Sequence, residues 1–351
     1  IGLLMLASLS TTMSTALTVK SVISFSQFAL LYFFSCKAVL RQEELKLQIR
    51  RIVGVLILGG MATAMVSFHH LFSFGLYGAF VQRFTRLASI LSDPNYYAAY
   101  LSPLTLVIVS LAFASRRLLH TISFTVLALL ACMAVVFTLS RAGWAGLIFG
   151  LLCFSILHFL GSKNKRKVVF HWLALGVVLI LVAQIVLPTV GGELFPTLLS
   201  FRFQSLIQLS GLSIAMRVAL LKLALRLMMT RPFFGIGAGT FHLASMKYNV
   251  YPGTYGTFAH NTYAKLGAET GVLGFLVALY FVMGVVWYLV GSWRGTSDED
   301  YRTLLAGLTG AFLCVMFTAA TLDSIAEPYF WFYTTVAVIA ASVARQQDQG
   351  R

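Results

Sequence analysis

The sequence predicts an all-α polytopic integral membrane protein, and two observations carry this prediction. Apolar residues make up 59% of the 351 residues and charged residues only 11%, whereas soluble domains carry about 25% charged residues. Apolar runs of about twenty residues, enough to cross the hydrocarbon core of a bilayer, recur along the chain. Such runs cross lipid as helices, because a helix satisfies its own backbone polar groups.

About ten spans are visible, and because the chain starts at Ile1 within apolar sequence we expect further residues upstream. In order, we predict the spans at about 1–17, 21–40, 52–72, 95–114, 119–138, 143–161, 169–189, 262–291, 303–321 and 327–344.

Basic residues concentrate in every second connection. By the positive-inside rule these connections face the cytoplasm, and they comprise Arg41–Arg51, Arg116–Arg117, Lys163–Lys167, Arg294–Arg302 and the tail at Arg345. Alternation then places Ser73–Asn95, Leu139–Trp144, 190–260 and Asp323–Glu327 on the outer side. The chain divides into N-terminal membrane helices (1–189), a periplasmic loop containing helices (190–261) and C-terminal membrane helices (262–351).

The net charge of +15 does not predict nucleic-acid binding. The basic residues form short clusters between spans, where they set topology and meet anionic lipid headgroups, rather than a stripe on a soluble domain. The four cysteines lie inside apolar runs without the spacing of a metal site, which favours small buried apolar side chains.

The long outer segment is itself basic, although a translocated loop needs no positive charge for its topology. It holds Arg202, Arg217, Lys222, Arg226, Arg231 and Lys247 against the single acid Glu193. This excess predicts a negatively charged partner, and at the outer leaflet a lipid-linked phosphate or diphosphate fits.

Within that segment we predict a helix over Leu212–Met229. Helical spacing places Arg217 on an apolar side, where a bound anion would offset the cost of a buried guanidinium. Lys222 and Arg226 fall on roughly the other side, as an interface anchor.

Several short polar patterns have both a structural and a functional interpretation. Asp93-Pro94-Asn95 reads either as a helix N-cap with proline in the first turn or as a substrate-facing pair. Gly235, Gly237 and Gly239 lack the ending of a phosphate-binding loop and are expected to turn the chain and let the backbone approach backbone or ligand. Asp323 and Glu327 form an exposed loop pair or bind the acceptor.

Three ordered motifs resemble the bacterial O-antigen ligase and polymerase superfamily. They are Asp93-Pro-Asn95-Tyr-Tyr-Ala-Ala-Tyr; Thr138-Leu-Ser140-Arg141-Ala-Gly-Trp144; and the run Ser213…Arg217…Arg231-Pro-Phe-Phe-Gly235-Ile-Gly237-Ala-Gly239-Thr-Phe241…His260-Asn261-Thr-Tyr263…Glu269-Thr-Gly271…Gly274. The resemblance implies about twelve spans in the full chain and a large periplasmic loop.

The resemblance further implies a glycosyltransferase of the bacterial inner membrane. It would move a glycan from undecaprenyl diphosphate to a sugar of the lipid A core (ligase, which we favour) or to another lipid-linked unit (polymerase). Implied catalytic residues are His260, Arg217 and Arg141, with the arginines binding diphosphate and His260 acting as base. Implied substrate contacts are Arg202, Asn261, Tyr263, Asp93, Asn95, Ser140, Gly237 and Gly239.

We expect no metal and no cofactor, because the outer side carries no Asp-x-Asp pair and no His/Cys cluster with ligand spacing. His242 is the rival to His260 as the base. A transporter of lipid-linked sugars is the alternative from another class, but the polar residues gather at one face and no internal repeat is visible, unlike typical transporters.

Overall fold

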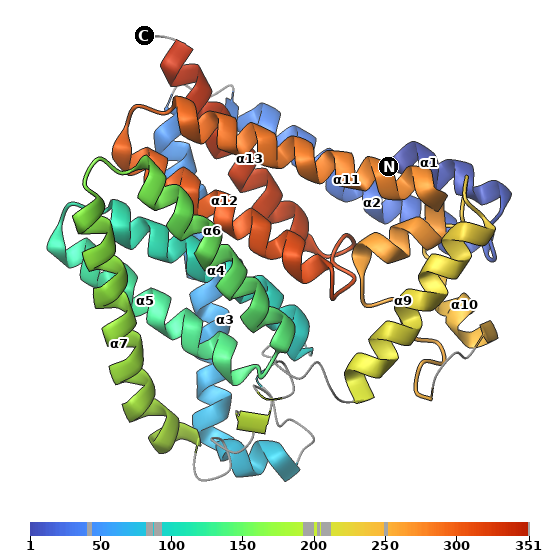
Figure 1. Ribbon diagram of the computed structural model, residues 1–351, viewed down its shortest axis with the longest axis horizontal. Helices are drawn as coiled ribbons and strands as arrows, with labels where there is room; N and C mark the ends of the chain where they lie inside the picture. The colour runs from blue at the N-terminus through green and yellow to red at the C-terminus, as the bar shows by residue number, and fades with distance from the viewer. Residues whose placement is uncertain are drawn as a thin grey trace. The chain divides into compact units, whose positions relative to one another are not determined.

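The computed structural model describes residues 1–40, 44–81, 87, 93–191, 200–201, 204, 212–248 and 252–349. Every regular element in these residues is a helix, which confirms the predicted fold class (Figure 1). The helices are α1 (Gly2–Ala7), the 3-10 helix η1 (Ser8–Ser10), α2 (Thr15–Leu40), α3 (Leu45–Val81), α4 (Pro94–Ala114), α5 (Leu118–Phe137), α6 (Arg141–Gly161), α7 (Lys165–Gly191), α9 (Leu212–Thr230), α10 (Phe241–Tyr248), α11 (Thr262–Gly295), α12 (Glu299–Ala319) and α13 (Pro328–Gln349).

Among the described residues, seven helices are long and apolar enough to cross a membrane, and all seven coincide with predicted spans. They are α2, α3, α4, α5, α6, α11 and α12. Helices α7 and α13 occupy the predicted spans at 169–189 and 327–344 but are not among the seven. The chain is therefore a multi-pass membrane protein.

The predicted span at 1–17 is wrong. The chain forms only the six-residue α1 and the three-residue η1 there, and α2 begins at Thr15 rather than near residue 21. The cause is the hydroxyl-rich run from Ser8 to Ser14. Its side chains bond to nearby carbonyls, as Ser8 does to Met5 at 2.6 Å, and this local bonding competes with a continuous helix.

The described chain divides into two compact units, each assembled from three separated segments. Unit 1 comprises Ile1–Ala38, Gln208–Trp287 and Met316–Thr335. Unit 2 comprises Val39–Ile207, Tyr288–Val315 and Val336–Arg351. Helices α11, α12 and α13 each have one part in unit 1 and the other part in unit 2. The boundary between the units therefore falls within helices.

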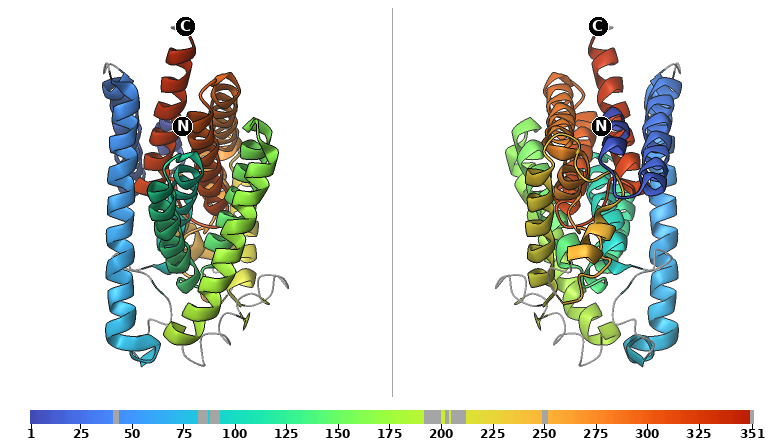
Figure 2. Two further views of the ribbon diagram at one scale, coloured as in Figure 1. Left: turned by 90° about the vertical axis from the view of Figure 1, so that its left-hand side faces the viewer. Right: turned by 90° about the vertical axis from the view of Figure 1, so that its right-hand side faces the viewer.

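Unit 2 is built around α4, which packs against α5 and α6 (Figure 2). Small residues let its helices approach closely: Gly143 of α6 lies against Ala98 of α4, and Gly307 of α12 lies against Ser110. Gly150 of α6 faces the backbone of α12, so that any side chain there would collide. Close packing through small residues is how helices associate in lipid, where burial of apolar surface gives little driving force.

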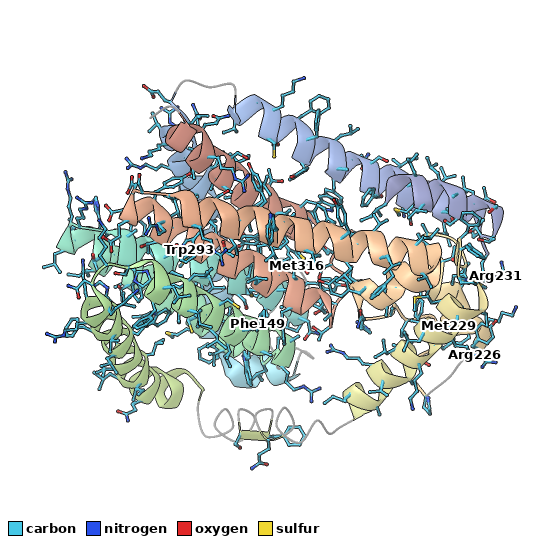
Figure 3. The ribbon with its side chains drawn as sticks, turned by 45° about the horizontal axis from the view of Figure 1, so that its top comes forward. Phe149, Arg226, Met229, Arg231, Trp293 and Met316 are labelled. Carbon is cyan, nitrogen blue, oxygen red and sulfur yellow. The ribbon has the colours of Figure 1, made fainter. Side chains whose placement is uncertain are left out.

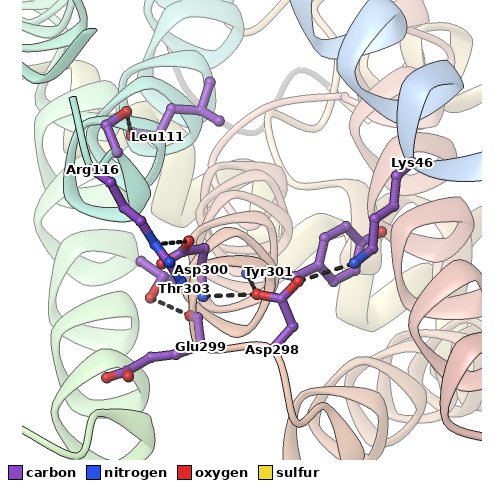
Figure 4. Close-up of polar contacts among 9 residues, drawn as sticks. Lys46, Leu111, Arg116, Asp298, Glu299, Asp300, Tyr301 and Thr303 are labelled. Carbon is purple, nitrogen blue, oxygen red and sulfur yellow. Dashed lines mark hydrogen bonds and ion pairs between the residues drawn. The ribbon is translucent and has the colours of Figure 1, made fainter. Parts of the chain in front are cut away.

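Three of the predicted cytoplasmic connections contact one another in unit 2, through Lys46, Arg116 and the acidic residues at 298–300 (Figure 4). Lys46 forms an ion pair with Asp298 at 3.0 Å and Arg116 with Asp300 at 2.7 Å. Glu299 accepts hydrogen bonds from the connection that follows α6, including one from Ser162 at 3.1 Å. Connections that the basic pattern predicted to share one side therefore lie together, as the alternation of spans requires.

The contacts of Asp298 also change its pKa. Partial burial opposes its ionisation, but the hydrogen bond from Lys46 and those from two backbone amides outweigh burial and hold the pKa of Asp298 below its usual value. The charged form is therefore favoured, and the acidic connection at 298–300 ties α3 to the start of α12.

Candidate active site

Helix α9 confirms the helix predicted over Leu212–Met229. Its buried stripe is Leu220, Leu223, Ala224 and Leu227, which packs with residues of the turn after α9, α10 and the start of α11. Lys222 and Arg226 are exposed as predicted, whereas Arg217 is half-buried at the edge of the stripe. Figure 3 shows Arg226 and Met229 on the C-terminal half of this helix and Arg231 directly after its end.

The three glycines after α9 turn the chain onto α11. Gly235, Gly237 and Gly239 all have positive φ angles of 64°, 103° and 76°, a region that costs glycine nothing. Backbone amides of Ile236 and Gly237 donate to carbonyls of α11 at 3.0 and 3.1 Å. A side chain at any of the three glycines would collide with α11 or α2 or with the segment between η1 and α2. The expected close backbone approach is thus confirmed.

The hydroxyl-rich N-terminal segment docks on this turn. Arg231 donates from its guanidinium to the carbonyl of Thr11 at 2.9 Å, and the amide of Ala238 donates to Ser8 Oγ at 3.1 Å. Met13 donates its amide to the carbonyl of Ile236 at 2.9 Å. This docking gives the run a structural role in unit 1 in place of the predicted span.

His260 has a left-handed backbone conformation, with a φ of 49°. A non-glycine residue in this region is uncommon, and such strain concentrates at functional sites. Asn261 follows and caps α11, because its side-chain oxygen accepts from the amide of Ala264 at 3.0 Å. The half-buried His260 is therefore held at a fixed helix start.

The next two residues anchor this helix start to the 316–324 segment. Thr262 donates to the carbonyl of Leu322 at 2.7 Å and accepts from the amide of Ser324 at 2.8 Å. Tyr263 donates its hydroxyl to the carbonyl of Met316 at 3.0 Å. Asn261 and Tyr263, predicted as substrate contacts, thus have structural hydrogen bonds in unit 1.

A cavity of ≈ 300 Å³ opens beside this helix start, within unit 1. Its polar lining includes Lys20, His242, Lys265 and Glu269, and Phe258 forms an aromatic wall. Glu269 is 3% exposed and accepts from the amide of Phe241 at 3.0 Å, which fixes the start of α10. Only one residue, Ala259, separates the cavity-lining Phe258 from the strained His260.

Lys265 is the residue of this site that the sequence analysis missed. Its side chain is 14% exposed, and its ammonium lies 3.8 Å from Asp323 Oδ2 and 5.5 Å from the centre of the Phe258 ring. One signal could have found it: Lys265 and Glu269 stand four residues apart at the start of an apolar span, where charged side chains are rare and mark function.

The predicted exposure of Asp323 is wrong. The exposed loop pair expected for Asp323 and Glu327 does not exist, because Asp323 is only 6% exposed and faces Lys265. Neither carboxylate oxygen has a hydrogen-bond partner among the described residues.

In unit 2, the polar motif before α4 has the geometry of a cap. Asp93 accepts from the amides of Asn95 and Tyr96 at 2.6 and 3.4 Å, with Pro94 in the first turn. Ser140 donates to the side-chain oxygen of Asn95 at 3.0 Å and accepts from the amide of Gly143 at 3.3 Å. The expected N-cap is confirmed, and the Asn95–Ser140 bond joins the starts of α4 and α6.

Arg141 is the first residue of α6 and is half-buried. The positive end of the helix dipole favours an anion rather than a cation at this position. The structure describes Arg141 within unit 2, separately from Arg217 and His260 of unit 1. Arg202 lies outside the described residues. Across the described part of the chain, no group of three or more His, Cys, Asp or Glu residues could hold a metal ion.

Comparison with known proteins decides the family. Residues 126–279 match the family model described as O-antigen ligase, a region from within α5 to within α11. Residues 126–279 therefore form a domain of the O-antigen ligase/polymerase superfamily. The match contains Arg141, Arg217 and His260, whereas Asp93 and Asn95 precede it. Membership implies an enzyme of the O-antigen ligase/polymerase type that transfers glycans. No curated protein matches the chain significantly.

Proposed function

We propose that this protein is an O-antigen ligase of the bacterial inner membrane. It moves the O-antigen glycan from undecaprenyl diphosphate to a sugar of the lipid A core on the periplasmic face. The observation that carries the assignment of the site is the strained backbone of His260, with a φ of 49°, inside the region that matches the family. Strain of this kind persists only where surrounding structure imposes it, and here Asn261 and Thr262 supply that support.

The chemistry assigns one task to each group. His260 removes the proton from the acceptor hydroxyl as the oxygen attacks the anomeric carbon of the donor. The bond from that carbon to the diphosphate breaks, and the diphosphate leaves with the electron pair. Arg217 and Arg141, with Arg202, bind this leaving group through planar guanidinium forks that match phosphate oxygens. A single displacement of this kind inverts the anomeric centre and needs no metal.

Substrate contacts lie on residues near these groups in the chain. Gly237 and Gly239 are assigned to the substrate site, and Gly239 lines the cavity of unit 1. Asn261 directly follows the proposed base in the chain, and Tyr263 lies three residues after it. Asp93, Asn95 and Ser140 form a hydrogen-bonded group beside Arg141 in the sequence of unit 2. The second candidate function within the same chemistry is an O-antigen polymerase, in which the acceptor is another lipid-linked glycan.

The product of the purified protein tests this proposal. We expect that protein supplied with undecaprenyl-diphosphate glycan, together with lipid A core, forms the glycan–core conjugate, and that Arg217→Lys abolishes it because lysine lacks the planar fork. Arg226→Lys, on the exposed side of the same helix, is the matched control and should retain transfer. Lengthened lipid-linked chains without conjugate would identify a polymerase, and donor movement without transfer would identify a transporter.

Orientation can be measured independently. We expect a cysteine at Tyr255, which is 65% exposed, to react with a membrane-impermeant thiol reagent in intact spheroplasts, because the 190–260 segment is predicted outside. The neighbouring Thr254 is 0% exposed and is unsuitable as a labelling position. A cysteine at the exposed Arg117 should react only after permeabilisation. The reversed pattern would contradict the periplasmic assignment.

A further inference from the structure

We propose that the cavity beside α11 binds one sugar ring of the acceptor glycan, with Phe258, Lys265 and His242 as its contacts. This inference rests on the proposed glycosyl transfer and adds to it a binding site for the acceptor, distinct from the groups that hold the diphosphate. Three observations carry it: the unused hydrogen-bonding groups, the balance of charge and the aromatic wall.

The first observation is a set of polar groups that lack hydrogen-bond partners within the described residues. His242 Nδ1 is buried without one, and so are both carboxylate oxygens of Asp323. The Lys265 ammonium lies 3.8 Å from that carboxylate, beyond hydrogen-bond distance. Buried polar groups are almost always satisfied. His242 and Lys265 line the cavity itself, whereas Asp323 lies behind Lys265. Polar groups left open at a cavity indicate a ligand that both donates and accepts, as vicinal hydroxyls do.

The second observation is that charge at the cavity is balanced. Lys20 and Lys265 are offset by Glu269, which lines the cavity, and by Asp323, which lies against Lys265. A diphosphate placed here would meet two carboxylates, and like charges at close range in a poorly hydrated site repel strongly. The balance favours a neutral polyhydroxyl ring over the anionic part of the donor.

The third observation is the size of the cavity and its aromatic wall. A volume of ≈ 300 Å³ lies at the small end of ligand sites, which suits a single sugar ring rather than a long glycan. Phe258 is 51% exposed, and the ring of His242 lies 5.9 Å from its centre. An aromatic face supplies an apolar surface for the C–H groups of a sugar while the polar groups around it bind the hydroxyls.

The position of the cavity favours the acceptor over the donor sugar. Phe258 precedes His260 by two residues and Lys265 follows it by five, so one short segment carries the wall, the proposed base and the buried lysine. A ring held against Phe258 would therefore lie next to a residue that is close in the chain to the proposed base. The arginines remain available for the diphosphate.

Core oligosaccharide released from lipid A tests the site without any transfer reaction. We expect wild-type protein to bind it, as measured by saturation-transfer NMR and by titration, and Phe258→Leu to weaken binding by about five- to tenfold. Phe233→Leu is the matched control: Phe233 is 67% exposed in the same unit but does not line the cavity, and it should bind as wild type does. Unchanged binding in Phe258→Leu, or no binding by wild type, overturns the proposal.

Steady-state transfer separates this site from the proposed function. Phe258→Leu should raise the KM for lipid A core and leave kcat and the donor KM nearly unchanged. A rise in the donor KM instead would show that the cavity holds donor glycan and would overturn the acceptor assignment. Wild-type protein that binds core oligosaccharide but transfers nothing would refute the transferase proposal while leaving the sugar site in place.

Discussion

Replacing His260 should reduce glycan transfer by about 10²–10⁴-fold, the range typical for loss of a general base. Asparagine is the substitution of choice, because His260 has a φ of 49° and asparagine tolerates that conformation better than alanine does. His260→Asn therefore removes the base without adding strain. The variant should fold, should bind donor and core oligosaccharide, and should lose the acidic limb of the pH–rate profile.

His242→Asn provides the comparison. His242 lines the sugar cavity, so its replacement should raise the KM for the acceptor and leave transfer at saturating acceptor much less affected than in His260→Asn. If His242→Asn abolishes transfer while His260→Asn retains it, His242 is the base and the cavity is the reaction centre itself. If both variants stay active, no histidine acts as base and the arginines carry the catalysis.

The fold could be predicted because long apolar runs allow few structures in lipid. Spans such as 95–114 and 143–161 correspond to α4 and α6 within a few residues. The failure at 1–17 has an equally simple origin. Apolar content suggested a span, but the hydroxyl groups from Ser8 to Thr12 bond locally and to the glycine turn. Composition averaged over a run does not detect a short polar break inside it.

The site was only partly predictable, for reasons that differ between residues. Helical spacing placed Lys222 and Arg226 on the exposed side of α9, since that pattern is local. The burial of Asp323 depends on Lys265, fifty-eight residues earlier in the chain, and spacing carries no information about such a contact. The roles of Asn261 as a cap and Tyr263 as an anchor likewise follow from partners in the fold, such as Ala264 and Met316.

The three glycines after α9 were predicted in part. A cluster of three within five residues predicts a turn, but the sequence does not say what the turn meets. The structure supplies the neighbours: Gly235 lies against the backbone of α11, and Gly239 lies against Ser21 of α2. The turn therefore connects the N-terminal segment with the helix that follows His260.

Removing the charge of Lys265 should strongly destabilise unit 1. Lys265→Gln leaves the carboxylate of Asp323 buried at 6% exposure without its only ion-pair partner among the described residues. Breaking a buried pair in this way costs about 3–5 kcal/mol, because an uncompensated charge remains in a poorly solvated site. Thermal unfolding in detergent should show a clearly lowered Tm relative to wild type.

The double variant Lys265→Gln/Asp323→Asn should recover most of that loss, because it removes both charges and leaves two amides that can bond to each other. Arg116→Gln is the matched control at an exposed pair. The side chains of Arg116 and Asp300 are 80% and 42% exposed, and exposed pairs contribute at most about 1 kcal/mol.

A double variant as unstable as Lys265→Gln alone would mean that the lysine stabilises unit 1 through its contact with Phe258 rather than through Asp323. Equal effects of Lys265→Gln and Arg116→Gln would show that the Lys265–Asp323 pair is solvated, and the case for open hydrogen-bonding groups at the cavity would fall with it.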